Sequence, residues 1–157
     1  MEKKIVESIW ADGIPAKIDP KDRMTEEDVL KLAINFALDH VIPKHYRLLG
    51  VNEDTHSYPN ILVEYNLNQY AVAVVPSVFP FYRRMDVALA CRFAADCRKK
   101  DFIPIFLGIL VASNDPQRVE KSVLLKGDIF KMRLIGAKRI TEAADQSFDV
   151  SKLDFTF

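Results

Sequence analysis

The sequence contains few of the residues that carry common catalytic and cross-linking motifs. It has five glycines, two cysteines, three histidines and one tryptophan in 157 residues. We find no glycine-rich loop to cradle a phosphate, no GxSxG turn and no HExxH metal motif. Cys91 and Cys97 form no CxxC pair and have no histidine beside them, so we interpret them as reduced packing residues. The sequence predicts no metal ion and no cofactor.

Net charge and long apolar runs are also missing. Twenty-two basic and twenty-two acidic side chains cancel, so the total charge indicates neither a polyanion binder nor a membrane-surface protein. The longest apolar run, residues 102–112, contains Pro104 and is far shorter than the roughly 20 residues of a membrane helix. Residues 1–10 lack the apolar core of a signal peptide. We therefore expect a cytoplasmic protein without a membrane span.

Helical periodicity occurs twice. Thr25 followed by three acidic residues is a helix-start signal, and Pro43 is a stop signal, so the sequence predicts a helix from Thr25 to His40. A second helical pattern follows Pro80 and predicts a helix from Arg83 to Lys100.

Strand patterns surround the second helix. A short strand is expected near residues 46–51, and residues 61–65 and 70–75 are expected to form a hairpin through the connection 66–69. Residues 70–75 and 103–111 are apolar on both faces, which predicts parallel neighbours in mid-sheet, joined by the helix between them.

The end of the sequence predicts a second hairpin and a tail. Residues 122–126 and 129–135 flank Gly127-Asp128, a two-residue hairpin turn. The whole pattern indicates an α/β fold of three layers, with a mixed central sheet flanked by helices. We expect a single domain over residues 1–157, with its core at about 25–135 and a polar tail at about 136–157.

Two short segments carry a resemblance to a known family. Tyr58-Pro59-Asn60 opens one predicted strand and Val74-Val75-Pro76 ends the next. With the order helix, three strands, helix, strand, these segments resemble the restriction-endonuclease-like family, whose PD-(D/E)xK motif occupies the same places. The resemblance spans about residues 25–113 and is closest to the nuclease domain that begins type I restriction subunits.

The resemblance implies a degenerate active site. Asn60 would stand where that family has its metal-binding aspartate, and Val74 and Pro76 where it has the second carboxylate and the lysine. Valine and proline offer no metal ligand or proton relay, so catalysis by the family's metal-dependent route is not expected. A second alignment uses Asp54 as the first acid and Glu64 as the second, with Asn66 at the lysine position. That alternative predicts a divergent metal-dependent nuclease that Glu64→Ala would inactivate.

The net charge of zero conceals a difference in charge between the two halves of the sequence. Residues 1–78 contain eight basic and twelve acidic side chains, and residues 79–157 contain fourteen and ten. Arg83 and Arg84 stand at a predicted helix start, where they either meet an anion or pair with a nearby acid. Lys131 and Arg133 share one face of a predicted strand, as a phosphate-contacting stripe or as a charged sheet edge.

These observations support three functional hypotheses. The first is a non-catalytic interaction or regulatory domain with a degenerate nuclease-like fold. The second is a nucleic-acid-binding domain that uses the basic C-terminal half, and the third is the divergent nuclease. Whether the partner is a protein or a nucleic acid stays open, as does the oligomeric state. The Gly127-Asp128 hairpin and Phe155 and Phe157 suit a homodimer or a monomer equally well.

Overall fold

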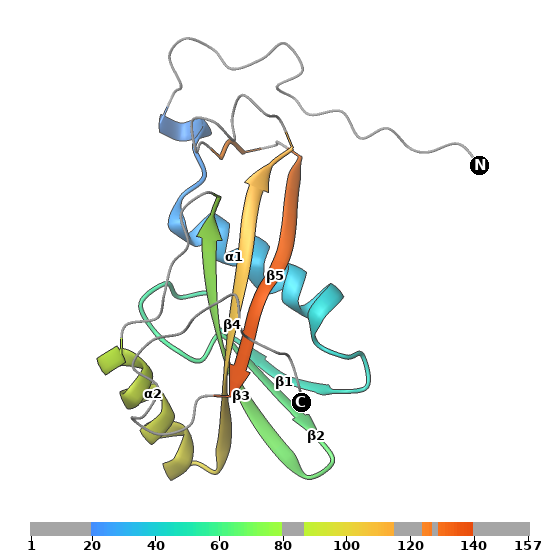
Figure 1. Ribbon diagram of the computed structural model, residues 1–157, viewed down its shortest axis with the longest axis vertical. Helices are drawn as coiled ribbons and strands as arrows, with labels where there is room; N and C mark the ends of the chain where they lie inside the picture. Colours follow the sequence, from blue (N-terminus) through green and yellow to red (C-terminus); the bar gives the residue numbers. More distant parts are fainter. Residues whose placement is uncertain (1–19, 80–86, 115–123, 127–128, 140–157) are drawn as a thin grey trace, which may run out of the picture.

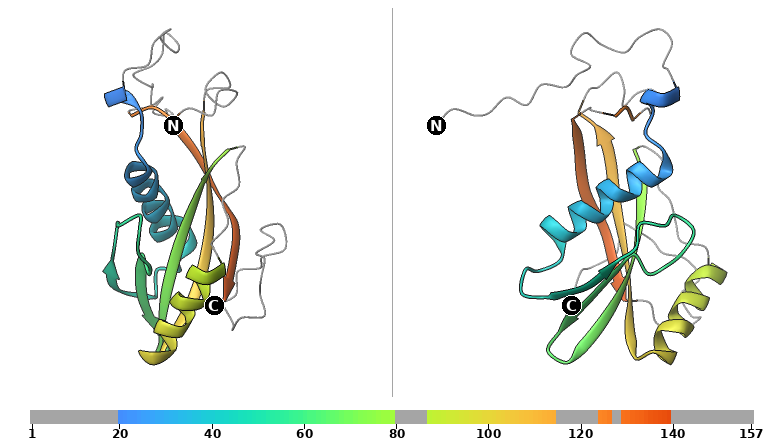
Figure 2. Two further views of the ribbon diagram at one scale, coloured as in Figure 1. Left: turned by 90° about the vertical axis from the view of Figure 1, so that its left-hand side faces the viewer. Right: turned by 180° about the vertical axis from the view of Figure 1, so that it is seen from behind.

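The protein folds around one mixed five-stranded sheet with a helix on each face (Figures 1 and 2). The computed structural model describes residues 20–79, 87–114, 124–126 and 129–139. The strands lie in the order β1-β2-β3-β4-β5. The elements are η1 (Pro20–Asp22), α1 (Glu26–Phe36), η2 (Ala37–Val41), β1 (Arg47–Val51), β2 (Ile61–Tyr65), β3 (Asn68–Val78), α2 (Val87–Lys99), β4 (Phe102–Ser113) and β5 (Phe130–Arg139).

The centre of the sheet is the parallel pair β3 and β4. Their register runs without a break from Gln69 opposite Phe102 to Val78 opposite Val111. Both strands are buried on both faces along most of their length, as expected for strands covered by helices on each side. The predicted parallel neighbours in mid-sheet are confirmed, and all other strand pairs are antiparallel.

Alternation along β3 and β4 divides the core into two layers. Val72 and Leu107 point to the face covered by α1, whereas Ala73 and Phe106 point to the face covered by α2. Small residues of β3 on the α2 face leave room for Phe93 of the helix. The side view in Figure 2 shows α1 to one side of the sheet, and α2 packs on the other face. The α/β class, the mixed sheet and the three layers are therefore observed.

The start of α1 is the best-defined local signal. The Thr25 hydroxyl accepts the Asp28 N–H at 3.1 Å, and the Asp28 carboxylate accepts the Thr25 N–H at 2.9 Å. This reciprocal capping box satisfies two N–H groups that have no partner within the helix. The helix ends at Phe36 and continues as the π-helical turn η2, so the predicted helix over 25–40 is confirmed within a residue or two.

The connection between β2 and β3 is tighter than predicted. The strands pair as far as Tyr65 opposite Asn68, which leaves the two-residue turn Asn66-Leu67 in place of a connection over 66–69. Asn66 has φ of 50° and Leu67 has φ of 67°, the left-handed conformation that a type I′ turn needs at both positions. Asparagine adopts it readily, but leucine in this region is strained by about 1 kcal/mol. The turn therefore holds one residue against its conformational preference.

The expected hairpin around Gly127-Asp128 is wrong. β5 pairs with β4, and residues 124–126, the described part of the expected first arm, are not part of the sheet. They pair instead with the segment before α1: Met24 N–H donates to the Leu124 carbonyl at 3.0 Å, and Lys126 N–H donates to the Asp22 carbonyl at 2.9 Å. This pairing buries Leu125 completely. Gly127 and Asp128 themselves lie outside the described residues.

The boundary of the polar tail was also misplaced. β5 continues to Arg139 and pairs with β4 as far as Ile105 opposite Arg139. Ala137 is buried opposite Leu107, just past a bulge at Ile135 of β5, where the register shifts between Gly108 and Ile109 of β4. Residues 140–157, with Phe155 and Phe157, and residues 83–86 of the second predicted helix lie outside the described residues.

The capping box predicts a measurable contribution to stability. Thr25→Ala should lower the free energy of unfolding by about 1 kcal/mol, measured by urea denaturation at pH 7.

The N–H group of Thr25 lowers the pKa of Asp28 below its ordinary value of 3.8. Its stabilisation is therefore present above pH 3.8 and is lost as the pH falls through the lowered pKa. Asp28→Asn should be less stable than wild type at pH 7, with the difference shrinking below pH 3.8. Glu27→Gln, in the same exposed turn, is the control and should show no such trend.

Candidate functional site

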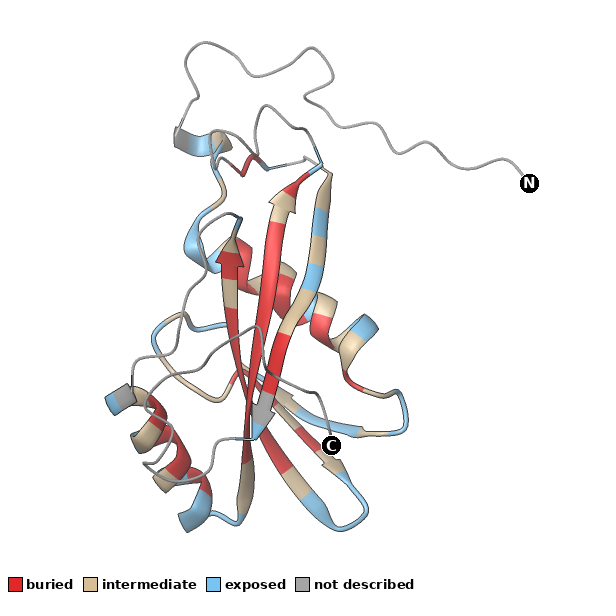
Figure 3. Cartoon of the chain, in the orientation of Figure 1, coloured by how far each residue is buried: buried red, intermediate tan, exposed pale blue. Residues whose placement is uncertain are grey.

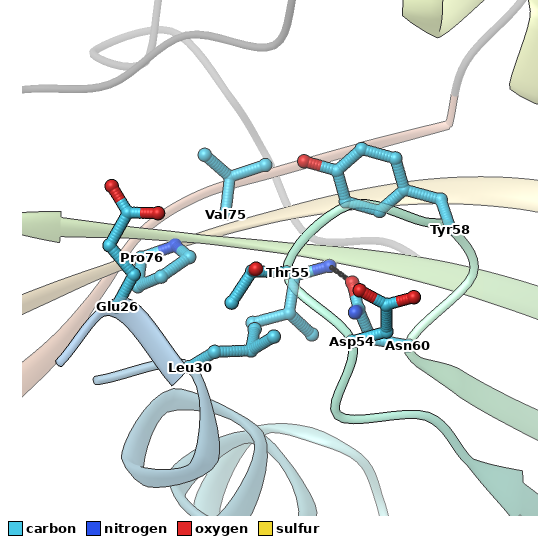
Figure 4. A pocket seen from close by; sticks show the side chains of 9 residues that line it. Glu26, Leu30, Asp54, Thr55, Tyr58, Asn60, Val75 and Pro76 are labelled. Carbon is cyan, nitrogen blue, oxygen red and sulfur yellow. Dashed lines mark hydrogen bonds between the residues drawn. The ribbon is translucent and has the colours of Figure 1, made fainter. Parts of the chain in front are cut away.

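A small pocket opens where β3 extends beyond the end of its partner β2. Its volume is about 40 Å³, enough for about three water molecules. Figure 4 shows its walls: α1 contributes one side, the β1–β2 connection the second, and β3 the floor. The lining residues are Glu26, Leu30, Asp54, Thr55, Tyr58, Asn60, Val74, Val75 and Pro76. The fold therefore brings the motif positions Asn60, Val74 and Pro76 and the acid Asp54 to one place.

Asn60 is the buried polar centre of this pocket, with 1% of its surface exposed. Its Oδ1 accepts the Val74 N–H at 2.8 Å, the dashed line in Figure 4, and its Nδ2 donates to the Asn52 carbonyl at 3.2 Å. The Asn60 main chain adds one bond to Val72 and one from Asn52. The amide thus continues the β2–β3 hydrogen bonds one step past the end of β2. It is engaged in holding the sheet together, and its oxygen is already used.

Pro76 fits the same strand geometry. Alternate residues of a strand direct their N–H groups to the same side, and both the Val72 carbonyl and the Val74 N–H point to the β2 side. Pro76 is the next residue of β3 on this side, and it lies beyond Val72, the last residue of β3 that pairs with β2. A proline is tolerated there because no strand needs the missing N–H. Val74 is fully buried against α1. Both residues at the degenerate positions therefore have roles in the sheet and its core.

The β1–β2 connection holds Asp54 at the mouth of the pocket. Its carboxylate accepts the His56 N–H at 2.9 Å and the Ser57 hydroxyl at 3.2 Å, and the Asn52 side chain accepts the Asp54 N–H. The His56 N–H bond, followed by the Ser57 bond, lowers the pKa of Asp54 below 3.8. Asp54 is thus an ionised turn residue held by its own loop.

Glu26 is the pocket residue that sequence reasoning missed. In the sequence it is only one of three acids at a helix start, yet the first turn of α1 brings it to the pocket beside Pro76, on the other side from Asp54 (Figure 4). The sequence carried no signal for this position, because it depends on where the start of α1 lies relative to β3. Among the described residues that line the pocket there are two carboxylates and no lysine, arginine or histidine.

Glu64 lies away from the pocket, near the opposite end of β2. Its carboxylate is 3.4 Å from Arg47 of β1 and accepts from Gln69 of β3 at 3.4 Å. The structure therefore does not bring Glu64 and Asp54 into one pocket. Within the described ranges, no three His, Cys, Asp or Glu side chains are grouped in a way that could hold a metal ion.

The basic candidates divide into two groups. Lys131 and Arg133 are exposed on one face of the edge strand β5, while Met132 and Leu134 pack into the core on the other face. Arg83 and Arg84 lie outside the described residues.

Of the two cysteines, Cys97 belongs to α2 and is buried between this helix and the sheet, and desolvation raises the pKa of its thiol to about 11. A thiol of this kind is uncharged at neutral pH and behaves as an apolar packing residue.

A second feature is an apolar surface at the far edge of the sheet. Five of the six large apolar side chains exposed in the described chain lie on β1 or on the β2–β3 hairpin. Figure 3 shows exposed stretches on β1 and at the turn of this hairpin. Four of them are 38 to 49% exposed, and Leu67 is 99% exposed. We call them the β1–hairpin surface: Leu48, Leu49, Val51, Tyr65 and Leu67.

Aromatic rings support one end of this surface. Tyr65 stacks on Tyr46 with 4.7 Å between ring centroids and 9° between ring planes, and His45 meets Tyr65 edge-on at 4.6 Å. Tyr46 is half-buried, and burial, with Tyr70 and Tyr65 nearby, raises its pKa above 10.0. These ring contacts pack Tyr65 against its neighbours at this end of the surface.

Comparisons with known proteins assign a family but no activity. A family model described as "Domain of unknown function (DUF8840)" matches residues 27–140, which include all of α1 except Glu26 and all five strands. No curated protein and no solved structure matches the chain. None of the described helices is long and apolar enough to cross a membrane.

The role of Asn60 predicts that a carboxylate cannot replace it. In Asn60→Asp, one oxygen can still accept the Val74 N–H, but the other faces the Asn52 carbonyl without a proton to donate. The loss in free energy of unfolding should be about 3 kcal/mol at pH 7. Burial raises the pKa of the new carboxyl in the folded protein, so the loss should shrink as the pH falls from 7 to 5.

Two controls accompany this measurement. Asn60→Ala should lose stability equally at both pH values, and Asn68→Asp, an exposed change of the same chemistry, should have little effect. If Asn60→Asp is as stable as Asn68→Asp at pH 7, the structural role assigned to Asn60 is wrong.

Proposed function

The chain belongs to the family of domains of unknown function DUF8840, and we propose that it is a non-catalytic interaction domain built on a degenerate nuclease-like fold. The observation that carries this proposal is the β1–hairpin surface. Large apolar side chains exposed together on neighbouring elements commonly mark a site of protein interaction. The five side chains of the β1–hairpin surface expose on the order of 500 Å², similar to the largest, often functional, patch on a typical monomer.

The chemistry of the pocket supports the non-catalytic part of the proposal. A metal-dependent nuclease needs carboxylates to hold the metal and a base or cation near the attacking water. At the motif positions this chain has an amide committed to Val74 and Asn52, a buried valine and a proline. The observed order of helix, three strands, helix and strand supports the restriction-endonuclease-like resemblance.

The location of the apolar surface supports binding through the sheet edge. β1 is the last strand on its side of the sheet, so its outer side has no strand partner within the described chain. Its side chains are exposed at every position except Gly50, which is half-buried. An exposed apolar edge strand can pair with another chain, and a partner protein would cover it.

Photo-crosslinking tests this proposal. We place the photoreactive amino acid p-benzoylphenylalanine at Tyr65, or as a control at Phe79, in the full chain inside cells that express it. Phe79 is the sixth exposed large apolar residue, similarly exposed at 37%, and lies at the opposite end of β3. We expect discrete crosslinked protein adducts from position 65 and none from position 79. Equal labelling at both positions, or none at position 65, would contradict the proposal.

A second candidate function rests on the basic face of β5. Lys131 and Arg133 are exposed side by side on one strand face, a spacing that suits contacts to successive phosphates of a nucleic acid. Binding of this kind would use the opposite edge of the sheet from the β1–hairpin surface.

Salt dependence tests nucleic-acid binding. Duplex DNA affinity is measured by fluorescence anisotropy at several salt concentrations. If β5 contacts phosphates, the variant Lys131→Glu/Arg133→Glu should bind at least tenfold more weakly and lower the salt slope by about 2. Lys99→Glu, an exposed cation on α2, is the control. A slope unchanged by the double substitution would rule out this role for β5.

A further inference from the structure

Leu67 is the least expected residue of the β1–hairpin surface. Its side chain is 99% exposed and its backbone has φ of 67°. Glycine at this turn position would relieve the backbone strain and remove an apolar side chain from water. Leucine is unfavourable here on both counts within a single chain. A contact made with another molecule would offset both, because it would bury the side chain.

The two outer edges of the sheet differ in a way that points to the kind of partner. β5 carries exposed cations at Lys131, Arg133 and Arg139, the usual protection of an edge strand against pairing. β1 carries one charged residue, Arg47, which is already paired with Glu64 at 3.4 Å. An edge-to-edge contact between β1 of one copy and β5 of another would set apolar side chains against cations. β1 is better matched by another β1.

The electrostatics also favour a partner identical to this chain. A surface can meet its own copy only if it does not repel itself, and the full chain has a formal net charge of zero. The ion pair at its rim joins Arg47 to Glu64 on the neighbouring strand. Across a two-fold axis, such a neutral pair presents each charge to a surface that carries both signs. A strongly charged partner would find no net opposite charge in this pair.

The shape of β1 limits the assembly to a closed pair. The strand has five residues, and its pairing with β2 shifts register between Leu48 and Gly50, which marks a bulge at Leu49. A short, bulged edge does not template a long sheet. The side chains of the surface would therefore form most of the contact. Their area of on the order of 500 Å² would form the apolar centre of a standard interface of about 800 Å² per partner.

From these observations we infer that two copies of the chain associate through their β1–hairpin surfaces about a two-fold axis, with each Leu67 buried against the other copy. This inference rests on the proposed function and names its partner. The two β1 strands run antiparallel across the axis, and the contact is isologous, so it closes after two copies.

Analytical ultracentrifugation of the full chain tests the dimer. The expected mass at high protein concentration is about 36 kDa, twice the 17.9 kDa of one chain. Leu67→Gly should raise the dimer dissociation constant at least tenfold, and Leu48→Glu should do the same by placing like charges across the axis. Phe79→Ser, which removes an exposed apolar residue far from the surface, should leave the dissociation constant unchanged.

Thermal unfolding separates a lost contact from a damaged fold. At a concentration where both proteins are monomeric, Leu67→Gly should melt at a higher temperature than wild type, because the turn strain is relieved. A variant that melts lower and also dissociates would mean that Leu67 supports the hairpin itself, and would overturn its role as a contact residue.

Hydrogen exchange of the β1 amides shows whether a second copy or another segment of the same chain covers the β1–hairpin surface. In the dimer, protection of residues 47–51 should rise with protein concentration in wild type and not in Leu67→Gly. For the β1 amides that point away from β2, protection already present in the monomer would mean that another segment of the same chain covers the surface, and the dimer proposal would fail. A wild-type protein that remains monomeric at all concentrations, or a dimer unaffected by both surface variants, would also overturn it. If the dimer fails these tests but position 65 crosslinks to a different protein, the proposed interaction function still holds. If position 65 gives no crosslinks either, both the dimer and the interaction function are wrong.

Discussion

The parallel pairing of β3 with β4 is the constraint on which the rest of the structure depends. Ten residues of each strand are paired in one unbroken register. Both faces of the two strands are apolar and buried along most of their length. A ladder of this kind is stable only when both faces are covered. One helix must therefore pack on each side, and the connection between the strands must cross one face, which is where α2 lies. The three layers follow from these two strands.

The pocket is a by-product of the same pair. β3 is longer than β2, so its side toward β2 is left without a strand partner beyond Val72. The chain manages this free edge with a side-chain amide at Asn60 and a proline at position 76, and α1 covers it from one face. What remains is a small polar recess. Its two acids, Glu26 and Asp54, come from a helix start and a turn, and Asp54 is already bonded within its own loop.

Elements with a strong local signal could be predicted from the sequence. The capping box at Thr25 indicated the start of α1. Runs that are apolar on both faces indicated that β3 and β4 are buried parallel neighbours. The hairpin around Gly127-Asp128 could not be excluded from local patterns, because the true partners of residues 124–126 are residues 22–24, a hundred positions earlier. Likewise, the motif positions Asn60, Val74 and Pro76 were identified from spacing, but the bond from Val74 to Asn60 depends on where β2 ends. Glu26 and the β1–hairpin surface needed the three-dimensional arrangement.

The pairing of residues 22–24 with residues 124–126 has a consequence for how the fold assembles. The β2–β3 hairpin closes a loop of two residues, whereas the bridge between Arg23 and Leu125 closes one of about a hundred. Chain entropy makes contacts that are close in sequence form early and distant ones form late. The distant pairing anchors the segment that leads into α1, and α1 supplies Glu26 and Leu30 to the pocket. We therefore expect the recess beside Asn60 to become complete late, after the sheet beneath it has formed.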